Sequence, residues 1–160
     1  MKKGLASLVV FVYLSFVPMP GLCNPLTCVV NAPSMIDFGT YNTVNTIDLP
    51  ANDITVTCSA THATVNPVVQ LSVGSGTYAA RTMSGPAGNV LYYNLYTNSN
   101  YTNIFGNGTS GTGDEAGGEQ TLFKSSATYE FPVYAQLQGG QNVAPGTYTT
   151  AQAITVTVSY

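Results

Sequence analysis

Residues 154–160, at the end of the sequence, alternate between apolar and polar side chains. A period of two predicts a β-strand with one buried face and one solvated face. The apolar row comprises Ile154, Val156, Val158 and Tyr160, and we expect these residues to face the core. No proline or lysine interrupts this strand, and a long apolar edge without such residues is a pairing site. The edge must therefore pair either with another strand of the same chain or with a strand from another molecule.

The start of the sequence is typical of a secretory signal peptide. Two lysines precede an apolar stretch, residues 5–17, which is too short to span a bilayer comfortably. Pro18 and Pro20 end this stretch, and Gly21 and Cys23 supply small residues at the −3 and −1 positions of a cleavage site. We expect residues 1–23 to be the signal peptide, with cleavage between Cys23 and Asn24.

A lipoprotein with Cys23 as the lipidated residue is the alternative interpretation of this segment. Leu22 directly before that cysteine fits poorly, because lipoprotein processing requires a small residue there. Under the favoured interpretation the protein is exported and has no transmembrane segment once the signal peptide is removed. Residues 24–160 then form one domain, since this length suits a single core and the sequence shows no linker or repeat.

The charge of the expected mature chain is low and negative. Removing the first 23 of 160 residues leaves 137, with Arg81 and Lys124 against seven acids, a net charge of −5. Such a chain does not attract nucleic acid or an anionic membrane electrostatically. Cys28 and Cys58 remain as the only cysteines, and in an exported protein we expect them to form a disulfide.

Short apolar or alternating runs separated by turn residues predict an all-β fold. No sustained helical period occurs after residue 23. The glycine-rich stretch 106–118 is expected to be a mobile loop because it has few apolar side chains to bury. The predicted strands cover residues 26–31, 36–41, 53–59, 68–73, 90–96, 120–124, 129–137 and 148–159.

Two motifs in the glycine-rich stretch resemble ligand sites but lack the surroundings that such sites need. Residues 106–111 match G-x-G-x-x-G, yet no helix or parallel β-α-β pattern follows to bind a pyrophosphate. Asp114, Glu115 and Glu119 are acidic, but their spacing is not that of a calcium loop. We interpret the stretch as a solvated loop and expect no cofactor and no metal.

The sequence offers no catalytic constellation. His62 is the single histidine and lies in a polar run that predicts an exposed turn, so zinc and hydrolase sites lack their partners. Asp37 and Glu130 are the only strand carboxylates that we considered as a glycosidase pair. We therefore predict that the protein is not an enzyme. Its 11 tyrosines are interpreted as half-buried strand residues, with contact to a partner as the alternative.

The order of several sequence blocks resembles the spore coat protein U domain family, which includes subunits of archaic chaperone–usher pili. The resemblance covers essentially all of the expected mature chain. The blocks are residues 28–30, 36–41, 54–58, 81–83, 91–96, 104–112, 131–134, 145–148 and 154–160.

This resemblance implies an immunoglobulin-like β-sandwich that is incomplete, because its last strand is missing. A periplasmic chaperone lends a strand to such a subunit, an outer-membrane usher assembles it, and the N-terminal extension of another pilus subunit later fills the groove. The open edge expected at Ile154, Val156, Val158 and Tyr160 fits that scheme. The implied role is adhesion or biofilm formation, in the periplasm first and then at the cell surface or outside the cell.

One departure from the family pattern limits this expectation. A donor strand needs about ten alternating residues ahead of the domain, but only residues 24–27 separate the expected cleavage site from Cys28. The chain can thus accept a strand but lacks the usual donor, which favours a terminal or accessory subunit. A self-contained secreted sandwich that binds a glycan or matrix surface and a protective spore-coat component are the alternatives.

Overall fold

The computed structural model describes residues 5–14, 26–41 and 43–160, and this part of the chain is all-β apart from one short 3-10 turn. The expected cleavage site at Cys23 and Asn24 lies outside the described residues. The elements are β1 (Leu5–Leu14), β2 (Thr27–Asn31), β3 (Met35–Thr40), β4 (Ile47–Leu49), β5 (Ile54–Val65), β6 (Val68–Leu71), β7 (Arg81–Ser84), η1 (Pro86–Gly88), β8 (Val90–Tyr96), β9 (Glu115–Ala116), β10 (Gln120–Phe131), β11 (Tyr134–Leu137), β12 (Tyr148–Thr149) and β13 (Ile154–Ser159).

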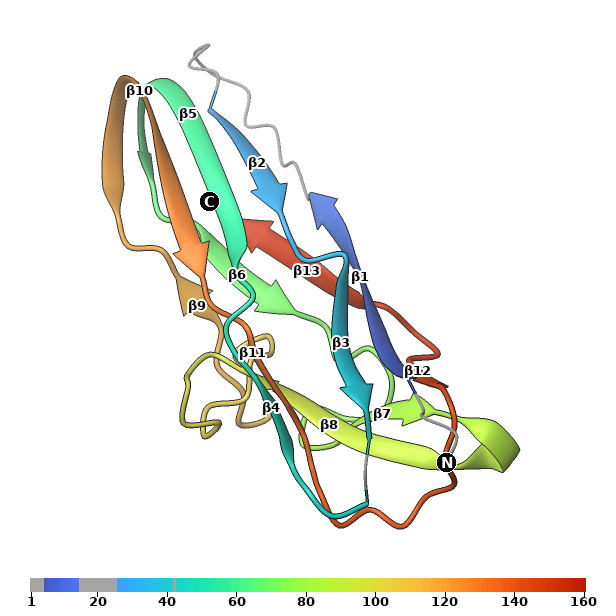
Figure 1. Cartoon of the computed structure of the whole chain (residues 1–160). Helices are drawn as coiled ribbons and strands as arrows, with labels where there is room; N and C mark the ends of the chain where they lie inside the picture. Colours follow the sequence, from blue (N-terminus) through green and yellow to red (C-terminus); the bar gives the residue numbers. More distant parts are fainter. Residues whose placement is uncertain (1–4, 15–25, 42) are drawn as a thin grey trace.

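The strands form a β-sandwich of a small sheet and a large, curled sheet (Figure 1). The small sheet has the order β10-β5-β2. The large sheet has the order β4-β11-β8-β7-β12-β1-β13-β6-β9, and β3 pairs with β1 beside this path. The fold class predicted from the sequence, an all-β sandwich, is therefore confirmed.

The core lies between the two sheets, and side chains along its strands alternate between buried and less buried positions. In β5, Ile54, Val56 and Cys58 are fully buried, while the threonines between them are half-buried. In β6, Val69 and Leu71 are buried in the same alternating manner. Burial of each such side chain contributes about 1.5–3 kcal/mol, so the two alternating runs supply much of what holds the sheets together.

A disulfide joins the first strand of the small sheet to its central strand. Cys28 in β2 lies directly opposite Cys58 in β5, and the two sulfurs are bonded at 2.03 Å. Both cysteines are buried. The predicted disulfide is therefore confirmed, and it closes a loop between residues that are 30 positions apart.

Replacing Cys58 with serine should lower the free energy of unfolding by about 3 kcal/mol, because the unfolded chain regains the entropy of that loop. Urea unfolding of the oxidised protein and of the variant measures the difference. Reducing the wild-type protein should cause a loss of similar size, which serves as the control. Two alkylatable cysteines in the native wild-type protein would contradict the prediction.

Strand ends differ from the predictions where cross-strand pairing overrides local composition. The mostly polar residues 125–128, predicted as a gap between two strands, continue β10 because each one pairs with a residue of β5. His62 likewise lies within β5, opposite Phe123, and not in the predicted turn, although its side chain is exposed as expected. Conversely, the long C-terminal strand is interrupted before Ile154, where the Gln152 amide donates to the Ser75 hydroxyl.

The glycine-rich stretch 106–118 is an ordered loop, contrary to the prediction of a mobile one. The Thr112 hydroxyl donates to the Thr109 carbonyl and accepts a hydrogen bond from the Asn107 amide. The Gly106 amide donates to the Gly113 carbonyl, and β9 pairs with β6. Hydrogen bonds therefore order a segment that buries little apolar surface, which the composition argument did not consider.

Candidate functional site: a groove between β3 and β13

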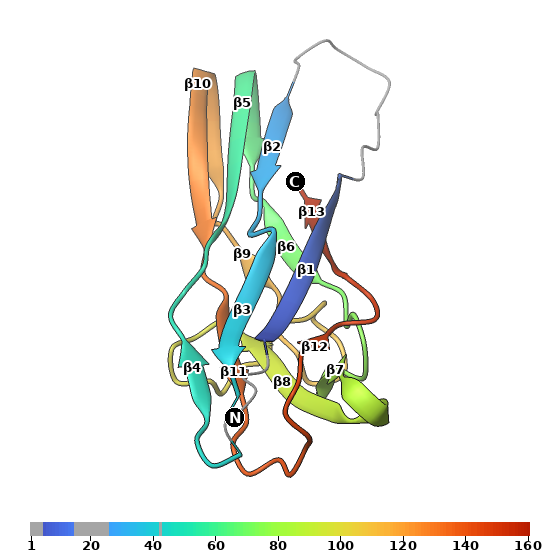
Figure 2. The same ribbon diagram turned by 45° about the vertical axis from the view of Figure 1, so that its right-hand side comes forward.

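The edges of β3 and β13 face each other across a gap that a third strand fills. That strand is β1, which pairs with both of them and runs beside β3 in Figure 2. It runs antiparallel to β3 and parallel to β13, and its first residues also pair with β12. Among the described strands, β3 pairs with β1 alone. The C-terminal edge is thus closed by a strand of the same chain, and this strand comes from the segment that the sequence predicts to be cut away.

The inner wall of this groove is the apolar row of β13. Ile154, Val156 and Val158 are 0, 0 and 1 % exposed in the presence of β1. Tyr160 differs from the expectation, since it lies beyond the end of β13 and is 37 % exposed. The pairing with β1 covers residues 154–158, and these residues define the edge.

The opposite wall is β3, which the sequence did not single out as part of the site. Ile36 and Phe38 are buried, and the ring of Phe38 packs 5.8 Å from that of Tyr93. The register between β1 and β3 shifts next to Phe38, which leaves this residue without a pairing partner on β1. Such a bulge bends a strand and re-aims a side chain, and here it accompanies a Phe38 ring that is buried in the core. The signal available in the sequence was the Ile36–Phe38 alternation.

The floor of the groove is apolar. A small cavity beneath the two walls is lined by apolar side chains only, including Ile36, Leu71, Leu95, Ile154 and Val156. An apolar floor has no polar partner to offer, so it favours apolar side chains on any strand that occupies the groove. Backbone pairing along the walls and apolar contact with the floor are the two interactions that this site can make.

The edge of β13 that lies away from β1 pairs with β6 and with Ser72, the residue that follows β6. The Ser72 amide donates to the Thr155 carbonyl at 2.9 Å, and the Thr155 amide donates to the Ser72 hydroxyl at 2.8 Å. Residues 156–159 pair with β6. One edge of β13 is therefore satisfied by the domain itself, and the other edge depends on the strand in the groove.

A buried arginine supports this region. Arg81, at the start of β7, is 0 % exposed and donates to the carbonyls of Ser72, Val73 and Phe105 and to Oδ1 of Asn94. Burial lowers the pKa of Arg81 to about 10, so the guanidinium stays charged at neutral pH. The same burial raises the pKa of the neighbouring Tyr93 hydroxyl. No pattern in the sequence predicts this structural role, since Arg81 stands out there only as one of two cations after residue 23 and as part of the block 81–83.

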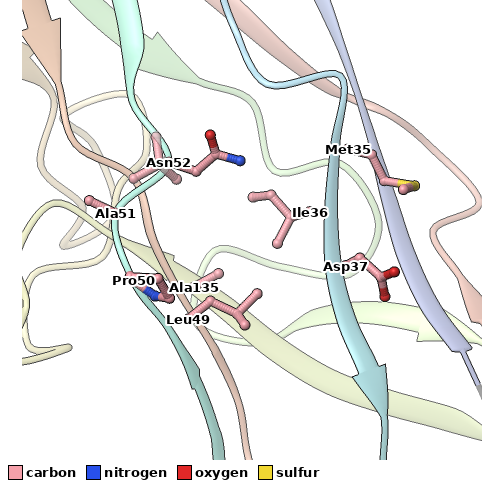
Figure 3. Close-up of a pocket in the computed structure, with 9 residues that line it drawn as sticks. Met35, Ile36, Asp37, Leu49, Pro50, Ala51, Asn52 and Ala135 are labelled. Carbon is pink, nitrogen blue, oxygen red and sulfur yellow. The ribbon is translucent and has the colours of Figure 1, made fainter.

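A second hollow lies on the other side of β3, with a volume of about 230 Å³ (Figure 3). Figure 3 shows Ile36 pointing from β3 toward Leu49 and Ala135, whereas Met35 and Asp37 point away from them. Pro50, Ala51, Asn52 and Val133 complete the lining. The lining is mostly aliphatic and holds one carboxylate, so this hollow lacks a set of groups for acid–base catalysis.

The other candidate residues do not form a site. Asp37 lies on β3 and Glu130 on β10, in different sheets, and the G-x-G-x-x-G residues 106–111 precede no helix. Asp114 accepts a hydrogen bond from Gln70, and Glu119 is exposed. Within residues 5–14, 26–41 and 43–160, no three histidine, cysteine or acidic side chains are grouped so as to hold a metal ion.

Most tyrosines of the stretch 92–101 belong to the core or to internal contacts. Tyr93 and Tyr96 are buried, and the Tyr101 hydroxyl donates to the Leu49 carbonyl. Tyr92 is 46 % exposed. The interpretation of tyrosines as packed strand residues therefore fits this stretch better than the partner-contact alternative does.

Replacing His62 with alanine, or Glu115 and Glu119 with glutamine, should change the free energy of unfolding by less than about 0.5 kcal/mol, as for surface sites in general. The reason is that the His62 side chain is exposed beside the Phe123 ring, that Glu119 is exposed, and that glutamine at position 115 leaves the backbone pairing of β9 unchanged. Urea unfolding and export yield are the measurements. A calcium-dependent or catalytic activity that either change abolishes would show that these residues form a site.

The comparisons with known proteins agree with this architecture. The family model of the Spore Coat Protein U domain matches residues 24–157. No curated protein matches the sequence. In the part of the chain that the structure describes, no helix is long and apolar enough to cross a membrane.

Proposed function

Because the chain belongs to the spore coat protein U domain family, we propose that it is an exported, non-enzymatic subunit of a chaperone–usher-type pilus or a related surface assembly. Proteins of this family are associated with the surface or with the spore coat. The subunit assembles by accepting a β-strand from another molecule, and the assembly serves adhesion or biofilm formation.

One observation carries this proposal. The facing edges of β3 and β13 are joined only through Leu5–Leu14 among the described strands, and that segment lies within the predicted signal peptide. A mature chain that begins at Asn24 lacks this strand, and its two edges are left with unpaired backbone groups above an apolar floor. Unpaired buried backbone groups cost about as much as lost hydrogen bonds, so such a domain needs a strand from elsewhere.

The partners follow from this need. A periplasmic chaperone supplies a strand first, an outer-membrane usher receives the complex, and a strand donated by another subunit replaces that of the chaperone. The family match begins at Asn24, the residue at which we expect the mature domain 24–160 to begin. The disulfide between Cys28 and Cys58 is consistent with folding in an oxidising compartment such as the periplasm.

The position within an assembly follows from the length of the segment ahead of β2. Only residues 24–26 separate the expected cleavage site from the first residue of β2, too few to fill the groove of a neighbour by the usual N-terminal extension. The chain therefore accepts a strand without donating one in that way. This property suits a terminal or accessory subunit better than a repeating shaft subunit.

Export of the full chain into a periplasm, with and without a pilus chaperone, tests the proposal. We expect the processed protein to be soluble as a complex with the chaperone and to aggregate or be degraded without it. A soluble, protease-resistant monomer in the absence of any partner would contradict the proposal. That result would favour a self-contained secreted sandwich that binds a glycan or matrix surface.

A further inference from the structure

The strand that fills the groove comes from the chain's own leader. Residues 5–17 form the apolar stretch of the predicted signal peptide, and ten of them, Leu5–Leu14, form β1. This strand pairs with three others, namely β3, β12 and β13. It links the part of the large sheet that ends at β12 to the part that begins at β13. The leader thus has a structural place in the fold in addition to its role as an export signal.

The register matches the leader's sequence to the groove. Val10, Val12 and Leu14 are opposite Ile154, Val156 and Val158, the buried row of β13. Residues that are directly opposite in a sheet share a face. The even-numbered positions 10, 12 and 14 of the leader therefore pair with the buried row of β13.

The odd-numbered positions 7 and 9 of the leader pair instead with exposed residues of β3. Val9 is opposite Met35, which is 47 % exposed, and Ser7 is opposite Asp37, which is exposed. A shift of one residue would exchange the two rows. The register thus predicts that the two kinds of position differ in their tolerance of charge, although the leader has apolar residues in both rows.

We propose that Leu5–Leu14 is an internal donor strand that occupies the groove until the leader is cut away. This inference rests on the groove that the proposed function uses. While the leader is attached, its strand competes for the groove against strands from other molecules. It does so at the effective concentration of an intramolecular ligand, which is about millimolar for a short linker. A strand of similar affinity from another molecule competes poorly for the groove when it is present below that concentration. Removal of the leader therefore converts a self-complemented chain into one that can accept a strand from another molecule.

The test uses the full chain, refolded under oxidising conditions, in three forms: wild type, Val12→Asp and Val9→Asp. The readout is hydrogen exchange of the β13 amides. Val12→Asp puts a charge in the row opposite Val156 and should speed their exchange by at least about tenfold. Val9→Asp is the matched control and should leave exchange within about twofold of wild type, because position 9 pairs with the partly exposed Met35. Val12→Thr preserves the shape of the side chain and should also speed β13 exchange, but by less than Val12→Asp does. If Val12→Asp does not fold, Val12→Thr takes its place in the test.

A second readout separates the leader's role from the open groove. A protease site is inserted between Leu14 and Leu26 and cut after refolding, and size-exclusion chromatography shows whether the strand stays bound. β13 exchange that becomes fast only after the cut strand leaves wild type, with quicker release from Val12→Asp than from Val9→Asp, supports the inference. Fast β13 exchange in wild type before the cut overturns it and leaves the proposed open groove intact. A strand that never leaves wild type after the cut also overturns it, because cutting would then not free the groove. Release with β13 still protected overturns both, because the edge would then be closed without any donor.

Discussion

Lysine in place of Val156 should lower the free energy of unfolding by about 3–5 kcal/mol, the size expected when an unpaired charge is forced into a core. Val156 is 0 % exposed, lies opposite Leu71 on β6 and lines the apolar cavity beneath the groove. That lining has no acidic side chain to pair with an ammonium group. The charge must be buried without a partner or must push β13 out of the sheet. Urea unfolding of the full chain measures the loss directly.

Lysine at Thr157 is the matched control, because it adds the same charge one residue along the same strand. Thr157 is half-buried on the opposite face of β13 and opposite Gln70 of β6. A lysine there can extend its ammonium group into water, so the cost should stay below about 1 kcal/mol. Recovery of the exported proteins with a pilus chaperone should follow the same order. Equal stability of the two lysine variants would mean that the alternation at residues 154–158 carries no information about burial.

The alternation of β13 and β5 could be predicted from the sequence because both strands bury one face. Where one face is apolar and the other polar, a period of two determines which side chains enter the core. Val156 of β13 occupies the predicted face, and Val56 and Cys58 of β5 are buried in the same alternating manner. The disulfide could be predicted for a different reason, namely that only two cysteines remain after the expected cleavage.

Other elements could not be predicted because their cause is distant in the sequence. Residues 125–128 are small and mostly polar, yet they continue β10 because β5 pairs with them, and the Thr128 and Thr57 hydroxyls lie 3.0 Å apart. Loop 106–118 is ordered by hydrogen bonds between its own side chains and backbone, a property that composition does not report. Short strands such as β4 and β9 consist of three and two residues and have no period to detect.

The groove was predicted in part. The sequence identified the β13 wall and left open whether its edge pairs within the chain or with another molecule. It did not identify β3 as the second wall, since a strand's neighbour depends on topology and not on local pattern. Nor did it assign the leader a place in the sheet, because a continuous apolar run such as residues 5–14 fits a signal peptide as well as a buried strand.

The second large effect is expected at Arg81, which connects three backbone segments at one point of the core. Its guanidinium donates to Ser72, Val73 and Phe105, and Ser72 in turn exchanges hydrogen bonds with Thr155 on β13. Arg81→Met preserves much of the volume but leaves these acceptors without their donor. Since each buried unsatisfied group costs about 1–3 kcal/mol, we expect a loss of about 3–5 kcal/mol in the free energy of unfolding.

Two further variants, Arg81→Lys and Lys124→Met, show whether the stability that Arg81 provides comes from its planar set of hydrogen-bond donors or from its positive charge. Lysine at position 81 keeps the charge but cannot reach the same acceptors in a fixed plane, so it should recover only part of the lost stability. Lys124→Met removes the other cation of the expected mature chain from an exposed site and should cost less than about 0.5 kcal/mol. Because Arg81 supports the segment that holds β13, hydrogen exchange in Arg81→Met should accelerate at β13 as well as at β7. If exchange accelerates at β7 alone, Arg81 stabilises its own strand without supporting the groove.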